Sequence, residues 1–362
     1  MILVTERNNL AAALGRVAGI IESRNTIPIL ANVLLTTESN TLTLRATNLD
    51  MEAVEIIPAA IGEPGATTIS ASLLTDLARS LPEGAQIGMK LAERLQITSG
   101  RTRVNLATLP PDHFPQLWSE DWPQSFSVEA EILAAMLDRV SYAQSEEASR
   151  AYIQGVNFAT MDGRLRLVGT NTHIISLVDG PKIPDIGQHT VPTRMVTEMS
   201  KLLAVGGQAM VSFSDNKVAL QVGSTTVTSK LIDRSLAFPN YQRVIPADPP
   251  LTASMDIASA LSAMRRASVA SQGIKDNLVM FTFKNGAIAV TARNSEADAL
   301  DEIDAEYEGE EIGVPLNLPY MLDILGAMPD SSVTVSFTDS RKAMIWRGDE
   351  DGLVVIAPLG VG

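Results

Sequence analysis

The chain has 362 residues, of which 45% are hydrophobic, 4% aromatic and 19% charged, which is the range of ordinary soluble globular proteins. Its formal net charge of −14 argues against a general affinity for nucleic acid, because phosphate contacts need local positive charge. The lack of cysteine excludes disulfides, thiolate nucleophiles and cysteine-based metal sites. We find neither a long apolar run nor a signal peptide, so we expect a cytoplasmic protein that does not enter a membrane.

An amphipathic helix is predicted near the start of each third of the chain. Its apolar residues are spaced three to four apart, as on a helix with one buried side. These residues are Leu10, Leu14, Val17 and Ile21, then Ile132, Leu133, Met136, Leu137 and Val140, and finally Ile257, Leu261, Met264 and Val269. Alternating strands follow, and a second helix is predicted in the segments that begin at Thr67, His189 and Ile312.

One segment recurs three times. Its copies begin at Asn40, Gly163 and Gly286, which are 123 residues apart, and in each copy a strand reaches an Asn corner before a second strand leaves. Such a period indicates repeated structural units. We therefore predict an α+β fold of three similar domains, 1–122, 123–246 and 247–362, each a helix-plus-antiparallel-sheet unit made twice. Their formal charges are −4, 0 and −10.

Five strings, in order along the whole chain, resemble the bacterial DNA polymerase III beta subunit (sliding clamp) family. They are ESRNTIPILANVLL, EPGATTISASLLTDLARSLPEGA, SGRTRVNLATLPPDHFP, GVNFATMDGRLRLVGTNTH and FPNYQRVIP. The resemblance implies a head-to-tail homodimeric ring of six similar lobes, with helices lining a hole for double-stranded DNA. It implies no catalytic site and no cofactor. The implied partners are the DNA polymerase III catalytic subunit, the clamp loader and other proteins with a clamp-binding motif.

A sliding ring should contact phosphates through cations that do not read sequence. The repeated helices carry suitable cations, and Arg24 and Arg150 match positions where the family contacts DNA. The alternative is that these are ordinary exposed helix charges; the recurrence on equivalent helices favours a basic lining. The predicted DNA-contacting residues are Arg24, Arg79, Arg139, Arg150, Arg194, Lys201, Arg265, Arg266 and Lys275, with Arg16 as a further helix cation.

The resemblance also implies an apolar pocket for a short peptide motif. By motif position it comprises Ile153, Thr170, Thr172, His173, Ile174, Ile175, Pro239, Arg243, Val244, Val355, Ala357, Pro358 and Leu359. The family's Thr-Asp-Gly-His-Arg-Leu string is TNTHII here, and its Met-Pro-Met-Arg-Leu end is APLGVG. Two adaptable thioethers are thereby lost. We hypothesise a divergent or accessory clamp with an altered partner repertoire.

The dimer contact implied by the resemblance involves Val104 in the first predicted domain and Val269 with Ala270 in the third. These side chains are smaller than is usual in the family. Since burial of apolar surface contributes roughly 25 cal/mol per Å², a loss of methyl groups weakens the contact. We therefore expect a ring that opens more easily than most.

Two other classes of protein are alternatives to a clamp. An enzyme is disfavoured because His113, His173 and His189 have no metal spacing and no nucleophile or phosphate-loop motif is present. His173 is matched by Asp50 and Glu296 in the other copies, which indicates a structural position, and a solvated strand end explains an acid pair at Asp50 and Glu52. The second class is a scaffold of the clamp fold that binds proteins without stable DNA encirclement. Loading onto DNA discriminates that scaffold from a clamp.

Overall fold

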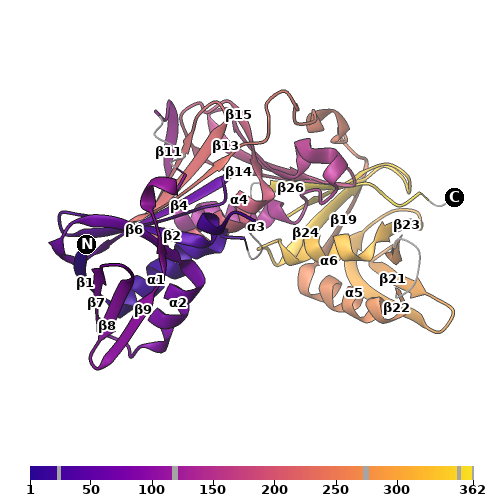
Figure 1. Ribbon diagram of the computed structural model, residues 1–362. Helices are drawn as coiled ribbons and strands as arrows, with labels where there is room; N and C mark the ends of the chain where they lie inside the picture. The colour runs from indigo at the N-terminus through magenta and orange to yellow at the C-terminus, as the bar shows by residue number, and fades with distance from the viewer. Residues whose placement is uncertain (23–25, 116–120, 272–276, 349–351, 361–362) are drawn as a thin grey trace. The chain divides into compact units, whose positions relative to one another are not determined.

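The structure is a computed structural model that describes residues 1–22, 26–115, 121–271, 277–348 and 352–360 (Figure 1). Its contacts divide the chain into two compact units. Unit 1 is Met1–Ala134 with Arg194–Leu231, and unit 2 is Ala135–Thr193 with Ile232–Gly362. The predicted middle domain thus contributes to both units, and the predicted domain boundaries stay a prediction.

The described part of unit 1 contains two antiparallel sheets. The five-stranded sheet has the order β5 (Ala60–Glu63), β1 (Ile2–Glu6), β7 (Gln86–Leu91), β8 (Leu95–Ser99) and β9 (Thr102–Leu106). The nine-stranded sheet has the order β10 (Thr108–Leu109), β6 (Gly65–Ser70), β2 (Asn32–Glu38), β3 (Thr41–Thr47), β4 (Met51–Pro58), β18 (Thr225–Lys230), β17 (Lys217–Val222), β16 (Gln208–Phe213) and β11 (Gln124–Glu129). Pairing of β4 with β18 joins the first and middle predicted domains in one sheet.

Helices α1 (Arg7–Val17) and α2 (Ala71–Ser80) pack side by side in unit 1 (Figure 1). The apolar residues of α1 face the core as predicted, and the Ser70 hydroxyl accepts a hydrogen bond from the Leu73 amide at the start of α2. The prediction that Ile21 continues the first helix is wrong, because the chain tightens into the 3₁₀ turn η1 (Ala18–Ile20). Two further 3₁₀ turns are η2 (Pro28–Ala31) and η3 (Pro111–His113).

Two helices span the division between the units. Helix α3 (Ala130–Ser141) begins in unit 1 and continues in unit 2, while α4 (Thr193–Leu203) lies almost wholly in unit 1. The predicted periodicity of α3 is confirmed at four of its positions, which are buried, but Ile132 is exposed.

The described part of unit 2 contains one twelve-stranded antiparallel sheet. Its order is β15 (Gln188–Pro192), β12 (Gly155–Met161), β13 (Arg164–Thr170), β14 (Ile174–Lys182), β26 (Gly352–Ile356), β25 (Met344–Arg347), β24 (Ser332–Phe337), β19 (Leu251–Asp256), β22 (Asp298–Tyr307), β21 (Ala287–Arg293), β20 (Leu278–Lys284) and β23 (Ile312–Asn317). The hairpin from β12 to β13 turns at Asp162 and Gly163, whose φ angles of 52° and 74° are those of a tight two-residue turn. The 3₁₀ segment η4 (Ala148–Ile153) precedes β12 in the sequence, and a second one, η5 (Tyr241–Val244), lies between β18 and β19.

Helices α5 (Ile257–Ser271) and α6 (Leu318–Gly326) pack side by side in unit 2 (Figure 1). Below them lies an aromatic core in which the rings of Phe283 and Phe337 are 4.5 Å apart and Phe281 meets Trp346 edge to face. Each buried side chain of this size contributes about 1.5–3 kcal/mol to stability. Because the described residues of each predicted domain form two α-helices packed on antiparallel sheet, the predicted α+β class is confirmed.

The three repeated corners share one geometry. At the first corner, Asn48 Oδ1 accepts hydrogen bonds from the amides of Asp50 and Met51, at 3.1 and 2.7 Å. Asn171 and Asn294 do the same for the amides two and three residues after them. An asparagine that binds its own backbone in this way fixes a turn without help from neighbouring elements. The predicted repeat is therefore present in the structure.

A buried acid in β4 ties several elements of unit 1 together. The Glu55 side chain is 1% exposed, and its carboxylate accepts two hydrogen bonds from the Arg16 guanidinium, at 2.8 and 3.1 Å. The hydroxyls of Ser224 and Thr225 donate to the same carboxylate. Because an unpaired buried charge is costly, this network fixes α1 and β18 on β4. Arg16, predicted as a helix cation for DNA, is thus already bound within the fold.

Candidate functional site

An apolar surface lies beside the corner between β13 and β14. Its buried floor comprises Val168, Ile175, Leu177, Tyr241, Ile345 and Val355, and Phe238, Ile245, Ala343 and Leu353 pack against it. Ile175 and Val355 were predicted pocket residues, and they pair across adjacent strands. The other four floor residues were missed. Leu177 follows Ile175 by two residues and Ile345 pairs with Val355, so strand periodicity and register point to both.

The two isoleucines of the predicted pocket face opposite sides of β14. Ile175 belongs to the floor, whereas Ile174 is 1% exposed and packs in the core of α5 and α6. Successive side chains on a strand point to opposite faces, so the two cannot line one pocket. The prediction that Ile174 lines the pocket is therefore wrong. The family's Arg at this position is replaced here by a core residue.

The other predicted pocket residues divide by exposure. Ile153 is buried, and the buried Thr170 hydroxyl donates to the Ile174 carbonyl oxygen at 2.7 Å. Val244, at 55% exposure, presents an apolar side chain to solvent. Also exposed are Thr172, His173, Pro239, Arg243 and Ala357, while Pro358 and Leu359 are half-buried. An apolar floor with exposed polar side chains beside it is the composition of a peptide-binding site.

The rim of this surface is fixed by contacts between distant segments. The rings of His173 and Tyr320 are 6.1 Å apart, and the backbone amide of Ala357 donates to the His173 carbonyl oxygen at 3.0 Å. Leu359 donates from its amide to the Pro315 carbonyl oxygen, so the C-terminal segment is held at two points. Tyr320, on α6, was missed because nothing in its local sequence links it to position 173.

Arg150 lies at this rim. Its Nη1 donates to Thr172 Oγ1 at 2.7 Å, and its Nε is 3.1 Å from the Glu147 carboxylate. Thr172 has a φ of 80°, which a β-branched residue rarely adopts. The Arg150 bond supports this corner. Arg150 was predicted to contact DNA, which stays a prediction, and in the structure it is bonded to a predicted pocket residue.

A second ion pair holds the 3₁₀ turn η5 against the floor. Arg166 and Asp179 form two hydrogen bonds of 2.6 Å, and these bonds, with Tyr241 close by, raise the pKa of Arg166. Tyr241 is itself a floor residue. The exposed Arg243 and Val244 follow in the same turn, so this network sets their position at the edge of the site.

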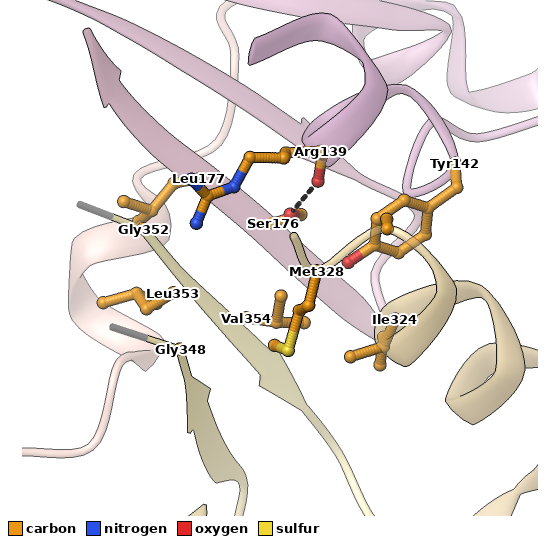
Figure 2. A pocket seen from close by; sticks show the side chains of 11 residues that line it. Arg139, Tyr142, Ser176, Leu177, Ile324, Met328, Gly348, Gly352, Leu353 and Val354 are labelled. Atoms are coloured by element: carbon orange, nitrogen blue, oxygen red, sulfur yellow. Dashed lines mark hydrogen bonds between the residues drawn. The ribbon is translucent and has the colours of Figure 1, made fainter. Parts of the chain in front are cut away.

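A small pocket in unit 2 lies beside Arg139 (Figure 2). It has room for about one water molecule, and α3, β14, α6 and β26 contribute its walls. A Cβ atom at Gly352 would lie 2.7 Å from Arg139 Nη2, so the guanidinium packs closely over this glycine. Arg139 was predicted to contact DNA, but its half-buried side chain lies against its own sheet.

Tyr142, labelled at the right of Figure 2, allows a test of the packing between these elements. Its buried hydroxyl has no hydrogen-bond partner in bonding geometry among the described residues, although Ser176 lies near, and burial raises its pKa. We expect Tyr142→Phe to keep or increase the free energy of unfolding, by up to about 1 kcal/mol. Thermal and urea unfolding measure the change.

Tyr307→Phe is the matched control. The Tyr307 hydroxyl donates to the Glu310 carbonyl oxygen at 2.8 Å, so its removal should cost about 1 kcal/mol. A loss in Tyr142→Phe as large as that in Tyr307→Phe would contradict the assignment of the Tyr142 hydroxyl as unpartnered.

The remaining predicted DNA cations are of two kinds. Three are paired with carboxylates: Arg194 with Glu22, Lys201 with Glu198, and Arg266 with Asp301. Arg79 and Arg265 are exposed and have no carboxylate partner among the described residues. Arg24 and Lys275 lie outside the described residues.

Two of the strand edges that have no partner strand among the described residues carry the predicted contact residues or lie near them. One belongs to β9, which ends its sheet and carries exposed Arg103 beside half-buried Val104, with exposed Arg101 in the turn just before the strand. The other is the first part of β22, where Asp298–Asp304 pair only with β21. An unpaired strand edge is a template for another chain.

The exposed residues near the β22 edge include Asp298, Leu300 and Glu302, with Leu300 at 72% exposure. Val269, on α5, is 68% exposed, as a contact residue should be. Ala270 is 1% exposed and packs in the core. The prediction that Ala270 contributes to a dimer contact is therefore wrong, because adjacent helix residues face different sides.

The acids and bases considered for catalysis are not brought together as a catalytic site in the described part of the chain. Asp50 pairs with Lys230 at 2.8 Å, and Glu52 pairs with Arg45 at 3.2 Å. Buried His189 places Nε2 2.7 Å from the Ile186 carbonyl oxygen, and His113 lies exposed in η3. Among the described residues, no group of three or more His, Asp or Glu side chains is placed to hold a metal. In the same residues no helix is both long and apolar enough to cross a membrane.

The sequence matches known domains along almost its whole length. Residues 1–118, 127–240 and 242–358 match the N-terminal, central and C-terminal domains of the DNA polymerase III beta subunit. The beta sliding clamp of Caulobacter vibrioides is 34% identical over 354 residues, which are 94% of each chain.

Solved structures agree with this match. A crystal structure of the Caulobacter crescentus beta sliding clamp with bound polyethylene glycol is 33% identical, with a TM-score of 0.95 over 100% of both chains. A Bartonella birtlesii sliding clamp bound to griselimycin is 32% identical, with a TM-score of 0.94 over 100% of both chains. The repeated α+β domains and the apolar site therefore define a clamp protein. The chain belongs to the DNA polymerase III beta subunit family, the beta sliding clamps.

Proposed function

We propose that this chain is a DNA sliding clamp that encircles duplex DNA as a head-to-tail homodimer and tethers the replicative polymerase. The observation that carries this is the match of all three domains to one family, at 34% identity over 94% of the chain. The comparisons support a clamp rather than a protein-binding scaffold of the same fold. The clamp acts as an accessory subunit with no catalytic site of its own, and the clamp loader supplies the energy for loading.

Charge and strand edges support a homodimer. The β9 edge carries Arg103 and follows directly on Arg101, whereas the β22 edge carries Asp298 and Glu302. Pairing β9 of one subunit with β22 of another joins opposite charges and satisfies backbone groups that otherwise face solvent. Because the two edges differ, the contact is head-to-tail, and a closed ring follows if the rotation closes. The exposed Val269 and Leu300, with the half-buried Val104, supply the apolar part.

The apolar site supports recognition of a peptide. A disordered segment loses conformational entropy on binding, so it needs buried apolar anchors to offset that loss. The floor around Ile175, Leu177 and Val355 offers such anchors, and His173, Arg150 and Arg243 offer polar contacts at its edge. The proposed occupants are motifs of the DNA polymerase III catalytic subunit, the clamp loader and other clamp-binding proteins. An altered partner repertoire stays a prediction.

Two measurements on one preparation test the proposed function. Light scattering across a dilution series gives the mass, and we expect about twice the subunit mass of 38.7 kDa. After loading with a clamp loader and ATP, we expect retention on nicked circular DNA and loss when the circle is cut. A persistent monomer, or equal retention on circular and linear DNA, would contradict encirclement.

Val244→Asp tests the peptide site. Val244 is exposed and apolar, so an aspartate there folds normally but places a charge beside the apolar floor. We expect the affinity for a labelled peptide with a clamp-binding motif to fall by about tenfold or more, measured by fluorescence polarisation. Val205→Asp, at a similarly exposed valine of unit 1, is the control and should bind the peptide as the unmodified chain does. Equal affinities for the two variants would place the peptide elsewhere.

A further inference from the structure

On helices α4 and α5, three of the cations predicted to contact DNA are paired with a carboxylate. On α4, Lys201 Nζ lies 2.7 Å from the Glu198 carboxylate one turn earlier, and that carboxylate is almost fully buried. On α5, Arg266 is paired with Asp301, which lies on β22. Both cations remain largely exposed, so their charged groups can reach a ligand while the acids stay in place.

Arg194 is restrained in a related way. Its Nη1 lies 2.7 Å from the Glu22 carboxylate, and its Nη2 donates to the Ile20 carbonyl oxygen at 2.8 Å. Glu22 is about half exposed, so its attraction for Arg194 is screened by solvent more than that of the buried Glu198. Arg79 and Arg265, in contrast, have no carboxylate partner among the described residues and offer their full charge to a phosphate.

We propose that Glu198 and Asp301 set the mobility of the clamp on DNA, because each holds one helix cation and limits its bond to a phosphate. The inference rests on the proposed function. Each paired cation and its acid have little net charge, and a phosphate that approaches the cation is repelled by the neighbouring carboxylate. The cation exchanges between two anions a short distance apart instead of leaving one for water. Contacts made in this way are weak and exchange easily, as sliding requires.

The proposal predicts a change in salt dependence. Each phosphate that a cation neutralises contributes about 0.9 to the slope of log K against log salt for duplex DNA. Removing an acid should therefore add roughly one such contact per subunit, since the released cation binds phosphate fully. The total charge of the chain is of secondary importance, because the effect depends on which acid is removed.

The test uses full-length Glu198→Gln and Asp301→Asn, which keep the side-chain shape and the hydrogen bond but remove the charge. Asp339→Asn is the matched control. Asp339 pairs with Lys342 at 3.7 Å in a turn and also caps that turn, which asparagine does equally well. It changes the net charge by the same amount away from the helices. Light scattering first verifies the mass of each variant.

Two readouts are measured at several salt concentrations. The first is the affinity for a short linear duplex, which needs no loading, and the second is the diffusion constant of loaded rings on stretched DNA with blocked ends. For Glu198→Gln and Asp301→Asn we expect a steeper salt slope and diffusion slower by several-fold at low salt. For Asp339→Asn we expect the behaviour of the unmodified chain.

The outcomes separate this inference from the proposed function. If the variants load and diffuse like the unmodified chain, with an unchanged salt slope, the mobility role is overturned and the clamp remains. An equal effect of Asp339→Asn would also overturn it, because net charge alone would then be responsible. If no form is retained on circular DNA but the two variants still show steeper salt slopes, encirclement is contradicted while the role of these acids is supported.

Discussion

Replacement of Glu55 by alanine is expected to lower the free energy of unfolding of unit 1 by about 3–5 kcal/mol. The change leaves the Arg16 guanidinium without its carboxylate and leaves the hydroxyls of Ser224 and Thr225 without their acceptor. An uncompensated charge near the core accounts for most of the loss. Glu55→Gln should lose less, because the amide oxygen still accepts hydrogen bonds.

Hydrogen exchange measured by mass spectrometry locates this effect. Peptides from β4 and β18 should exchange faster in Glu55→Ala, while peptides from unit 2 should be unchanged. Glu38→Ala is the control, since Glu38 is exposed at the end of β2 and its replacement should change stability by less than about 0.5 kcal/mol. Unchanged protection of β4 in Glu55→Ala would show that the network contributes little.

Replacement of Val269 by glutamate is expected to weaken the dimer by roughly 100-fold. An exposed apolar side chain becomes a charge that loses its water in the apolar part of the proposed contact. Desolvation of an unpaired charge costs several kcal/mol, and each 1.4 kcal/mol is a factor of ten in the dissociation constant. Sedimentation across a dilution series measures the change.

Leu73→Glu gives the matched comparison for Val269→Glu. Leu73 is also an exposed apolar residue of a helix, α2, but it lies far in the sequence from β9 and from β22. We expect its dissociation constant to equal that of the unmodified chain. If Val269→Glu dimerises as tightly as Leu73→Glu, the contact lies elsewhere. Val269→Leu should tighten the dimer if the small side chain is what weakens it.

Much of the fold follows from local patterns in the sequence. The helices α1, α3 and α5 follow from apolar spacing, and the three corners follow from a fixed period with an asparagine in each copy. Both patterns depend on residues close together in the chain. The boundaries were less accurate where two short elements meet, as at Ile21.

The site was only partly predictable, because its decisive contacts join distant residues. Arg16 meets Glu55 39 positions away, Arg266 meets Asp301 35 positions away, and Arg194 meets Glu22 172 positions away. No local sequence pattern identifies these partners, so the sequence shows each cation but not the carboxylate that it binds. The error at Ile174 differs in kind, since strand alternation alone excludes two neighbouring pocket residues.

The asparagine corners separate folding from recognition. In each corner the turn is held by an Asn side chain and its own backbone, so the turn does not depend on the side chain two positions later. That position holds Asp50, His173 and Glu296 in the three copies. A substitution at this position can therefore change the side-chain chemistry of one corner without altering its turn or the other two corners. In this clamp the position is a histidine in one corner, where its ring contacts Tyr320, and an acid in each of the other two corners.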